Sequence, residues 1–172
     1  VAGFCNMIFR MIEKNITENK TTHLAVIFDH KSKTFRSDIY PEYKANRPPA
    51  PDDLIPQFEL IKKATLAFNI PCIEVKGYEA DDIIASYAVK ARDSGAEVTI
   101  ISSDKDLMQL VGNGISMFDS MKNKKISSLE VKEKFGVEPS RVIDVQSLAG
   151  DSTDNIPGAP GIGIKTAAQL IN

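Results

Sequence analysis

The sequence contains four groups of acidic residues. Three lie where an apolar run ends or a helix begins, and the fourth lies in a glycine-rich loop between helical segments. Their members are Asp29, Glu79, Asp81, Asp82, Asp104, Asp106, Asp151 and Asp154. Any single group has an ordinary structural explanation as a helix cap, a first-turn acid or a turn residue. If the groups lie close together, their mutual repulsion must be offset by raised pKa values or by bound cations. The alternatives are therefore local capping or a shared cation site.

The elements expected from the apolar pattern explain why these acids should meet. Residues 23–28, 71–75, 98–101 and 115–118 are short apolar runs typical of buried strands, with helical patterns between them. This alternation predicts an α/β fold with a mostly parallel sheet and helices on both faces. The carboxyl ends of parallel strands share one edge, so three of the acidic groups should converge there. Asp104 should open a short helix, and a hairpin is expected near Asn123.

The chemistry of these residues favours a hard divalent cation. No histidine or cysteine cluster accompanies the acids, and oxygen-only sites suit Mg²⁺ or Mn²⁺ rather than zinc. Two such ions about 4 Å apart form the usual arrangement for phosphodiester cleavage. The pattern therefore predicts a two-metal site with Mg²⁺ or Mn²⁺ as cofactor.

A basic segment follows the first acid directly. Residues 30–51 include Arg36, Lys44 and Arg47, with Tyr43 among them. An exposed solvated loop would have this composition. A segment that contacts phosphates and stacks bases would have it too, and its position places it over the predicted metal site.

A glycine-rich loop lies near the end of the sequence, where the pattern has become helical. Gly161 and Gly163 leave backbone N–H groups open at the start of a helix, and Lys165 adds a positive charge. Such a helix start binds phosphate without sequence preference, although an ordinary turn between helices is the alternative. We expect residues 1–127 to form the α/β core and residues 128–172 a helical lobe.

Composition sets broad limits on the class of protein. The 172 residues are 42% hydrophobic and 26% charged with a net charge of −2, which is an ordinary globular balance. Asp52 and Asp53 are placed to cap a helix whose apolar stripe consists of Leu54, Phe58, Ile61 and Leu66. Cys5 and Cys72 form no paired motif, so both should be reduced and buried. No apolar run approaches the roughly 18 residues of a membrane span.

Five stretches carry a family resemblance, and they occur in one order along the chain. They are VIFDHK, FRSDIYPEYKANRPPAPDDL, GYEADDIIA, SSDKDLMQL and GDSTDNIPGAPGIGIKTA. Together they resemble the successive motifs of the 5′-nuclease domain of bacterial DNA polymerase I, which is related to flap endonucleases and phage 5′-exonucleases. The stretch KANRPPAPDDL favours the polymerase I branch. The resemblance covers nearly the whole chain.

The resemblance implies roles for individual residues. Asp29, Glu79, Asp81 and Asp82 would hold one metal ion, and Asp104, Asp106, Asp151 and Asp154 the other. Arg36, Lys44 and Arg47 would act in catalysis, with Tyr43, Lys44 and Arg47 also holding DNA in an arch. Gly161, Gly163 and Lys165 would bind duplex DNA in a helix–three-turn–helix (helix–hairpin–helix type) lobe, with a monovalent cation at its loop.

The resemblance also implies a biological setting. The fold would be PIN/5′-nuclease-like, and the substrate DNA with a 5′ flap or a nicked or RNA-primed duplex. The protein would be a monomer continued into a polymerase, in the bacterial cytoplasm at the nucleoid, acting in primer removal and repair. The family begins with a strand that bears a further aspartate, and Val1 already falls inside the helix that follows this strand. We therefore expect a fragment that lacks one metal ligand. Nuclease activity is expected of the parent protein rather than of this fragment.

Three other functions use parts of the same pattern. They are a free-standing 5′-exonuclease without a polymerase, a catalytically dead module that binds flap DNA, and a phosphatase-like hydrolase of small molecules. A pure binder gains nothing from eight clustered acids, and a small-molecule hydrolase needs neither the basic segment nor the glycine loop.

Overall fold

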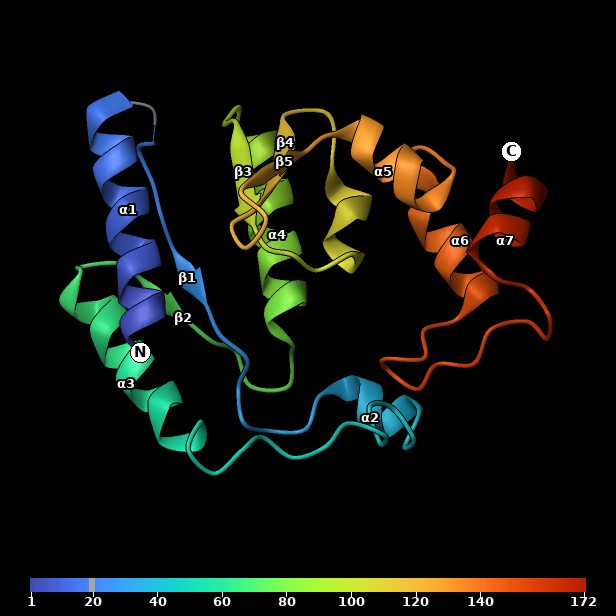
Figure 1. The fold of residues 1–172 in the computed structure, drawn as a ribbon, viewed down its shortest axis with the longest axis horizontal. Coiled ribbons are helices and arrows are strands. Elements are labelled where there is room, and N and C mark those ends of the chain that lie inside the picture. The colour runs from blue at the N-terminus through green and yellow to red at the C-terminus, as the bar shows by residue number, and fades with distance from the viewer. Residues whose placement is uncertain (19–20) are drawn as a thin grey trace. The chain divides into compact units, whose positions relative to one another are not determined.

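The computed structural model describes residues 1–18 and 21–172. The described chain forms two compact units, residues 1–32 with 48–80 and residues 33–47 with 81–172 (Figure 1). This division differs from the lobe boundary expected between residues 127 and 128, which stays a prediction. The α/β class is as expected, but the strands of the described residues form two small sheets rather than one.

The first unit packs two helices with a two-stranded parallel sheet. Its elements are α1 (Ala2–Glu18), β1 (Val26–Ile27), α3 (Ile55–Ala67) and β2 (Cys72–Ile73). Val26 pairs with Cys72 in parallel register. Ile8 and Ile70 are buried, and the Phe4 and Phe28 rings lie 6.4 Å apart between centroids. The apolar spacing of residues 4–12 predicts a first helix that ends near residues 18–20, and α1 is described only as far as Glu18.

Three finer expectations for this unit are wrong. The N-cap of α3 is Leu54, without a side-chain cap, because residues 52–54 form a turn that leads into the helix. Leu54 and two further members of the expected apolar stripe, Phe58 and Leu66, are exposed. Cys5 and Cys72 are free but only half-buried. Burial still raises the pKa of the Cys72 thiol.

The second unit contains a three-stranded mixed sheet. β3 (Val98–Ile101) pairs in parallel with β4 (Ile115–Asp119), and β5 (Lys124–Ile126) returns antiparallel to β4. Asn123 has a positive φ of 50° in the connecting turn. The buried Asp119 carboxylate accepts hydrogen bonds from the Met121 and Lys122 N–H groups, both at 3.0 Å. The hairpin expected near Asn123 is therefore confirmed.

Helices complete the second unit and position the candidate site. They are α2 (Phe35–Ile39), α4 (Ala80–Asp93), η1 (Asp106–Leu110), α5 (Ser128–Phe135), η2 (Pro139–Arg141), α6 (Val142–Ala149) and α7 (Ile164–Ile171). The helix that Asp104 was expected to open begins instead at Asp106 and is a single stretch of 3₁₀-helix. α5 begins with a capping box of Ser127 and Glu130.

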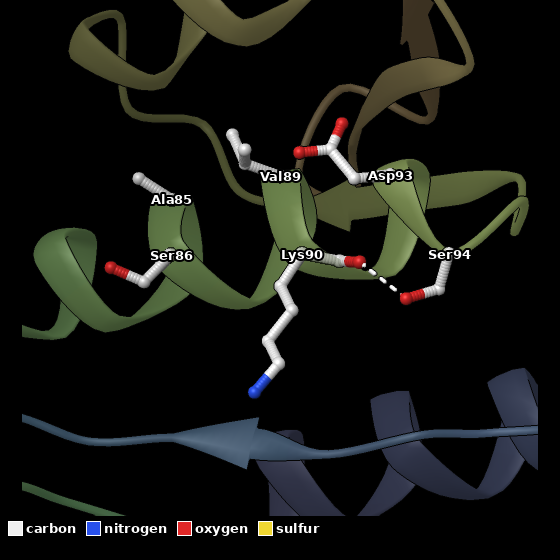
Figure 2. Close-up of a pocket in the computed structure, with 6 residues that line it drawn as sticks. All are labelled: Ala85, Ser86, Val89, Lys90, Asp93 and Ser94. Atoms are coloured by element: carbon white, nitrogen blue, oxygen red, sulfur yellow. Dashed lines mark hydrogen bonds between the residues drawn. The ribbon is translucent and has the colours of Figure 1, made fainter.

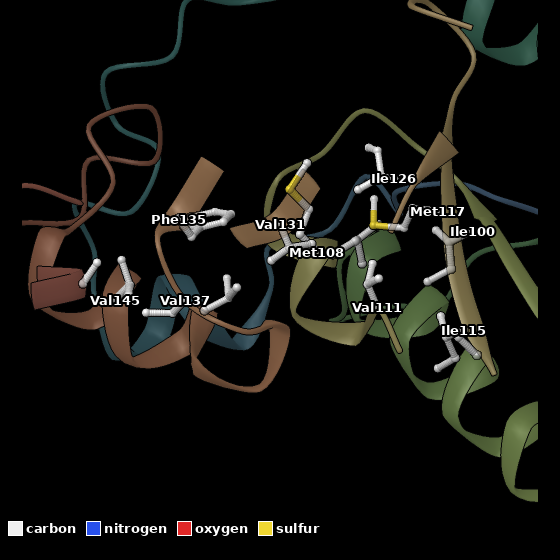
Figure 3. Packing of buried hydrophobic residues seen from close by; sticks show 14 of the residues in the cluster. Ile100, Met108, Val111, Ile115, Met117, Ile126, Val131, Phe135, Val137 and Val145 are labelled. Atoms are coloured by element: carbon white, nitrogen blue, oxygen red, sulfur yellow. The ribbon is translucent and has the colours of Figure 1, made fainter. Parts of the chain in front are cut away.

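One hydrophobic core joins the sheet and the helices of this unit (Figure 3). Ile100 and Met117 of the strands belong to the same buried cluster as Phe135 and Val145 of the helices. Leu107 of η1 is buried in it as well. The core therefore fixes η1 and the end of α6, the two places from which the candidate site is built. In the described part of the chain, no helix has the length and apolar character that crossing a membrane requires.

Candidate metal centre and its cationic neighbours

Three of the predicted acids come together in the second unit. Asp106 begins η1, and Asp151 and Asp154 lie in the loop after α6. One carboxylate oxygen from each lies within 4.8 Å of the others. Asp154 is only 7% exposed, and the other two are half-buried. Because all three donors are carboxylate oxygens at close range, the group fits a hard divalent ion such as Mg²⁺ or Mn²⁺.

The loop that carries Asp151 and Asp154 is closed by two glycines in direct backbone contact. A Cβ on Gly158 would lie 2.4 Å from the Ala149 carbonyl carbon, and one on Gly150 would lie 2.3 Å from the Gly158 nitrogen. Gly150 also has a positive φ of 71°. Asp151 and Ile156 exchange two backbone hydrogen bonds of 2.8 Å across the loop. The aspartates are thus held on a short, tight turn.

Cationic side chains of the protein itself contact these acids. Lys105 Nζ forms an ion pair with Asp151 and lies 3.4 Å from Asp106 Oδ1. Arg47 pairs with Asp154, whose Oδ2 lies 3.8 Å from Lys44 Nζ. These contacts provide the charge compensation that the sequence pattern requires.

The Lys105 contact is reflected in two pKa shifts. Burial opposes ionisation of Asp151, but hydrogen bonds from Lys105 and from the Thr153 N–H outweigh it, so the pKa of Asp151 lies below its ordinary value. Burial likewise opposes the charge on Lys105. The hydrogen bond to Asp151 and the negative charge of Asp106 outweigh burial, so the pKa of Lys105 lies above its ordinary value. Both groups are therefore charged at neutral pH.

Asp106 is oriented by neutral groups as well. Gln146 Nε2 on α6 donates to Asp106 Oδ1 at 2.5 Å, and Gln109 Nε2 donates to the Asp106 carbonyl at 2.7 Å. Asp104, which is exposed, accepts a 2.9 Å hydrogen bond from the Asp106 N–H. Asp104 therefore supports the turn that presents Asp106, and its expected part in metal binding stays a prediction.

The end of the basic segment is attached to the acidic loop by several hydrogen bonds. The Lys44 N–H donates to the Asp154 carbonyl at 2.9 Å, and the Tyr43 hydroxyl donates to Asp154 Oδ2 at 3.1 Å. Asn46 Nδ2 donates to the Ser152 carbonyl at 2.8 Å, and Asn155 Nδ2 donates to the Glu42 carbonyl at 2.7 Å. This attachment places Tyr43, Lys44 and Arg47 beside the carboxylates.

Arg36 lies at a different acid. Its guanidinium makes two 2.7 Å hydrogen bonds to Asp82 in the first turn of α4. It also stacks on Phe35, with its central carbon 4.7 Å from the ring centroid. Asp81 shares the first turn of α4. If Asp82 is to bind a metal, its carboxylate must contact the ion together with Arg36 or break its hydrogen bonds to Arg36. The metal-binding roles of Asp81 and Asp82 stay predictions.

The remaining predicted acids belong to the first unit. Asp29 is exposed, and its Oδ1 accepts a 2.7 Å hydrogen bond from the Ala80 N–H. Glu79 is half-buried. Their convergence with the acids of the second unit stays a prediction.

The predicted phosphate-binding residues lie around the start of α7. Gly161, Gly163 and Lys165 are all exposed, and Gly161 has a positive φ of 76°. Gly163 is the N-cap of the helix, and a Cβ there would meet nothing within 4 Å. Backbone N–H groups at this end are therefore accessible, as an anion site requires. Their role in DNA binding stays a prediction.

Several residues of the site were missed by the sequence reasoning. Lys105 lies between two predicted ligands, which is a signal that could have singled it out. Gly150 and Gly158 flank the acidic loop, and their close backbone contact is what such paired glycines permit. Gln146 and Asn155 carry no comparable signal, because only the folded chain brings them to their partners.

A pocket along α4 is separate from these residues. It has a volume of about 550 Å³ and is lined by Ala85, Ser86, Val89, Lys90, Asp93 and Ser94 (Figure 2). None of the predicted site residues lines it, so it offers no support for a catalytic role.

Comparison with known proteins places the chain, with its acid cluster and basic segment, in the 5′-3′ exonuclease family. The family description "5′-3′ exonuclease, N-terminal resolvase-like domain" matches residues 1–136. "5′-3′ exonuclease, C-terminal SAM fold" matches residues 137–172. The chain belongs to this family, which confirms the resemblance drawn from the motifs.

Similar proteins fall into polymerases, free-standing exonucleases and phage enzymes. DNA polymerase I of Rhizobium leguminosarum is 59% identical over 99% of this chain, which spans 17% of that protein. A 5′-3′ exonuclease of Aquifex aeolicus is 42% identical over 99% of this chain, which spans 58% of that protein. The structure of the bacteriophage T5 flap endonuclease with DNA and metal ions is 26% identical in sequence to this chain and has a TM-score of 0.80. The match covers 98% of this chain and 66% of the T5 chain.

Proposed function

We propose that this chain is the nuclease domain of a protein that hydrolyses DNA phosphodiesters from a 5′ end or at a 5′ flap, using divalent metal ions. The observation that carries the proposal is the group of Asp106, Asp151 and Asp154, with oxygens within 4.8 Å, in a chain of the 5′-3′ exonuclease family.

Asp106, Asp151 and Asp154 would hold one ion, which we take to be Mg²⁺ or Mn²⁺ from the oxygen-only donor set. When bound, such an ion activates water and stabilises charge on the phosphate. Asp29, Glu79, Asp81 and Asp82 would serve a second ion, with Asp104 completing the first set. The solved T5 enzyme with DNA and metal ions supports a metal-dependent reaction.

The basic side chains would bind the scissile phosphate. Lys44 and Arg47 lie beside Asp154 and can turn from that carboxylate to a bound phosphate. Arg36 would do the same from Asp82. Cations placed there offset the charge that develops in the transition state. Tyr43 would support this segment by its hydrogen bond to Asp154.

The start of α7 would hold the duplex at a distance from the reacting phosphate. Gly161, Gly163 and Lys165 expose backbone N–H groups and one positive charge, which bind phosphates of any sequence. A monovalent cation at this loop is part of the proposal. The substrate would be a 5′ flap or a nicked or RNA-primed duplex.

The identity to relatives favours a polymerase-linked protein. The polymerase relative is 59% identical, compared with 42% for the free-standing exonuclease. We therefore infer that the chain is part of a DNA polymerase I that is a monomer. This protein would lie in the bacterial cytoplasm at the nucleoid and would act in primer removal and DNA repair. A free-standing exonuclease with the same site is the second candidate, and the full reading frame distinguishes them.

Cleavage of a labelled 5′-flap duplex by the full-length protein tests the proposal. We expect cleavage with Mg²⁺ or Mn²⁺, none in EDTA, and none for Asp154→Asn with either metal. Lys132→Met serves as control, because Lys132 pairs only with the surface residue Glu138 among the contacts described for it. Cleavage that survives complete chelation would refute a metal-dependent nuclease.

A further inference from the structure

Lys105 lies among the acids that would hold the metal. Its ammonium contacts both Asp106 and Asp151, two members of the cluster. The side chain is 31% exposed, and that of Asp151 only 10%. Water therefore screens this contact less than it would screen a pair on the surface.

The other cations of the site meet a different acid. Lys44 and Arg47 contact Asp154, and both come from the segment proposed to bind DNA. Lys105 comes instead from the turn between Asp104 and Asp106, next to the candidate ligands in the chain. Its charge is thus a fixed part of the cluster, and binding of DNA does not bring it in.

A metal ion and the Lys105 ammonium draw on the same two carboxylates, those of Asp106 and Asp151. Three carboxylates with oxygens within 4.8 Å of one another repel, and a cation in contact with two of them relieves that repulsion. The same contact engages Asp106 Oδ1 and Asp151 Oδ2, two of the oxygens available to a metal. A metal that takes these oxygens displaces the ammonium.

From this geometry we infer that Lys105 is an internal counter-cation, which stabilises the metal-free acid cluster and competes with the metal for Asp106 and Asp151. It thereby sets the metal concentration at which the site fills. The inference rests on the proposed function, because it requires that these carboxylates bind a metal at all.

Mn²⁺ binding to the full-length protein, followed by electron paramagnetic resonance, measures this competition. Lys105→Met keeps most of the side-chain volume and removes the charge, and should bind Mn²⁺ about tenfold more tightly, the equivalent of one charge-assisted hydrogen bond. Lys105→Arg retains the charge and should bind more weakly than Lys105→Met. Lys132→Met removes the same charge from an exposed pair and should match the wild-type affinity.

Hydrogen exchange of the loop over residues 151–156 separates competition from a merely structural role. In EDTA, the loop of Lys105→Met should exchange faster than that of the wild type, because the metal-free acids have lost their counter-cation. At saturating Mn²⁺ the two proteins should exchange equally. A structural role for Lys105 predicts faster exchange in both conditions, and that result would overturn the inference.

The two proposals fail in different ways. If the wild type and Lys105→Met bind Mn²⁺ with equal affinity, the counter-cation role is refuted while the metal site stands. If neither protein, nor the Lys132→Met control, binds Mn²⁺, the metal site of the proposed function falls, and the role of Lys105 falls with it.

Discussion

Replacing Gly158 with alanine perturbs the loop that presents two candidate ligands without touching either of them. The added Cβ would lie 2.4 Å from the Ala149 carbonyl carbon and 2.6 Å from the Gly150 nitrogen. Both are backbone atoms, so no side-chain rotation relieves the contact. Restoring an ordinary contact of 3.4 Å requires the two sides of the loop to separate by about 1 Å.

That displacement has a predictable cost. Overpacking of this kind destabilises a protein by about 1–3 kcal/mol, which a folded domain tolerates. A 1 Å misplacement of catalytic groups lowers a rate by about 10²-fold. Because Asp151 and Asp154 lie within the loop, Gly158→Ala should weaken Mn²⁺ binding. It should also lower the rate of flap cleavage by about 10²-fold in a protein that still folds.

Single-turnover cleavage of a 5′-flap substrate and Mn²⁺ titration provide the assay. Gly163→Ala is the matched control for metal binding, since its Cβ would meet nothing within 4 Å and its φ of −96° suits alanine. The reasoning is refuted if Gly158→Ala binds Mn²⁺ and cuts DNA like the wild type, because the loop would then accommodate a Cβ without displacing Asp151 and Asp154.

Three further predictions follow from individual contacts. Lys44→Ala should lower single-turnover flap cleavage by about 10²-fold, the size of losing one electrostatic group, and an unchanged rate would show that the basic segment is only a solvated loop. Asp104→Ala should abolish cleavage yet leave flap binding intact in a gel-shift assay, whereas normal cutting would reduce Asp104 to a turn residue. Glu130 accepts hydrogen bonds from the Ser127 hydroxyl and N–H, which hold its pKa at about 2, below the ordinary 4.5. This stabilisation is present above pH 4.5 and is lost as the pH falls toward 2. The loss in free energy of unfolding caused by Glu130→Gln, measured in urea, should therefore become smaller over that pH range. A loss that stays constant with pH would contradict the prediction.

The sequence predicted much of the architecture, because periodicity reports which residues face a core. The strands ending near Ile101 and Phe118 and the hairpin at Asn123 follow directly from apolar runs and turn residues. Periodicity does not report hydrogen-bonded pairing, so the division of the strands into two sheets was not foreseen. It also does not distinguish a buried stripe from an exposed one, as Phe58 shows.

The candidate site was predicted in part for a similar reason. The meeting of Asp106 with Asp151 and Asp154 followed from motif order and from the resemblance to a family, since Asp151 lies 45 positions after Asp106 in the chain. The position of Lys105 between two predicted ligands was a signal that went unused. Gln146 was missed because its role depends on where its side chain ends, which no residue spacing encodes. The pairing of Arg36 with Asp82 is of the same kind.

The most direct test of the central claim is anomalous X-ray diffraction from crystals of the full-length protein soaked in Mn²⁺. We predict an anomalous peak within coordination distance of Asp106, Asp151 and Asp154, and its loss in Asp154→Asn. A protein that cleaves flap DNA in Mn²⁺ yet shows its peak only at other residues would contradict the assignment of these three carboxylates as a metal centre.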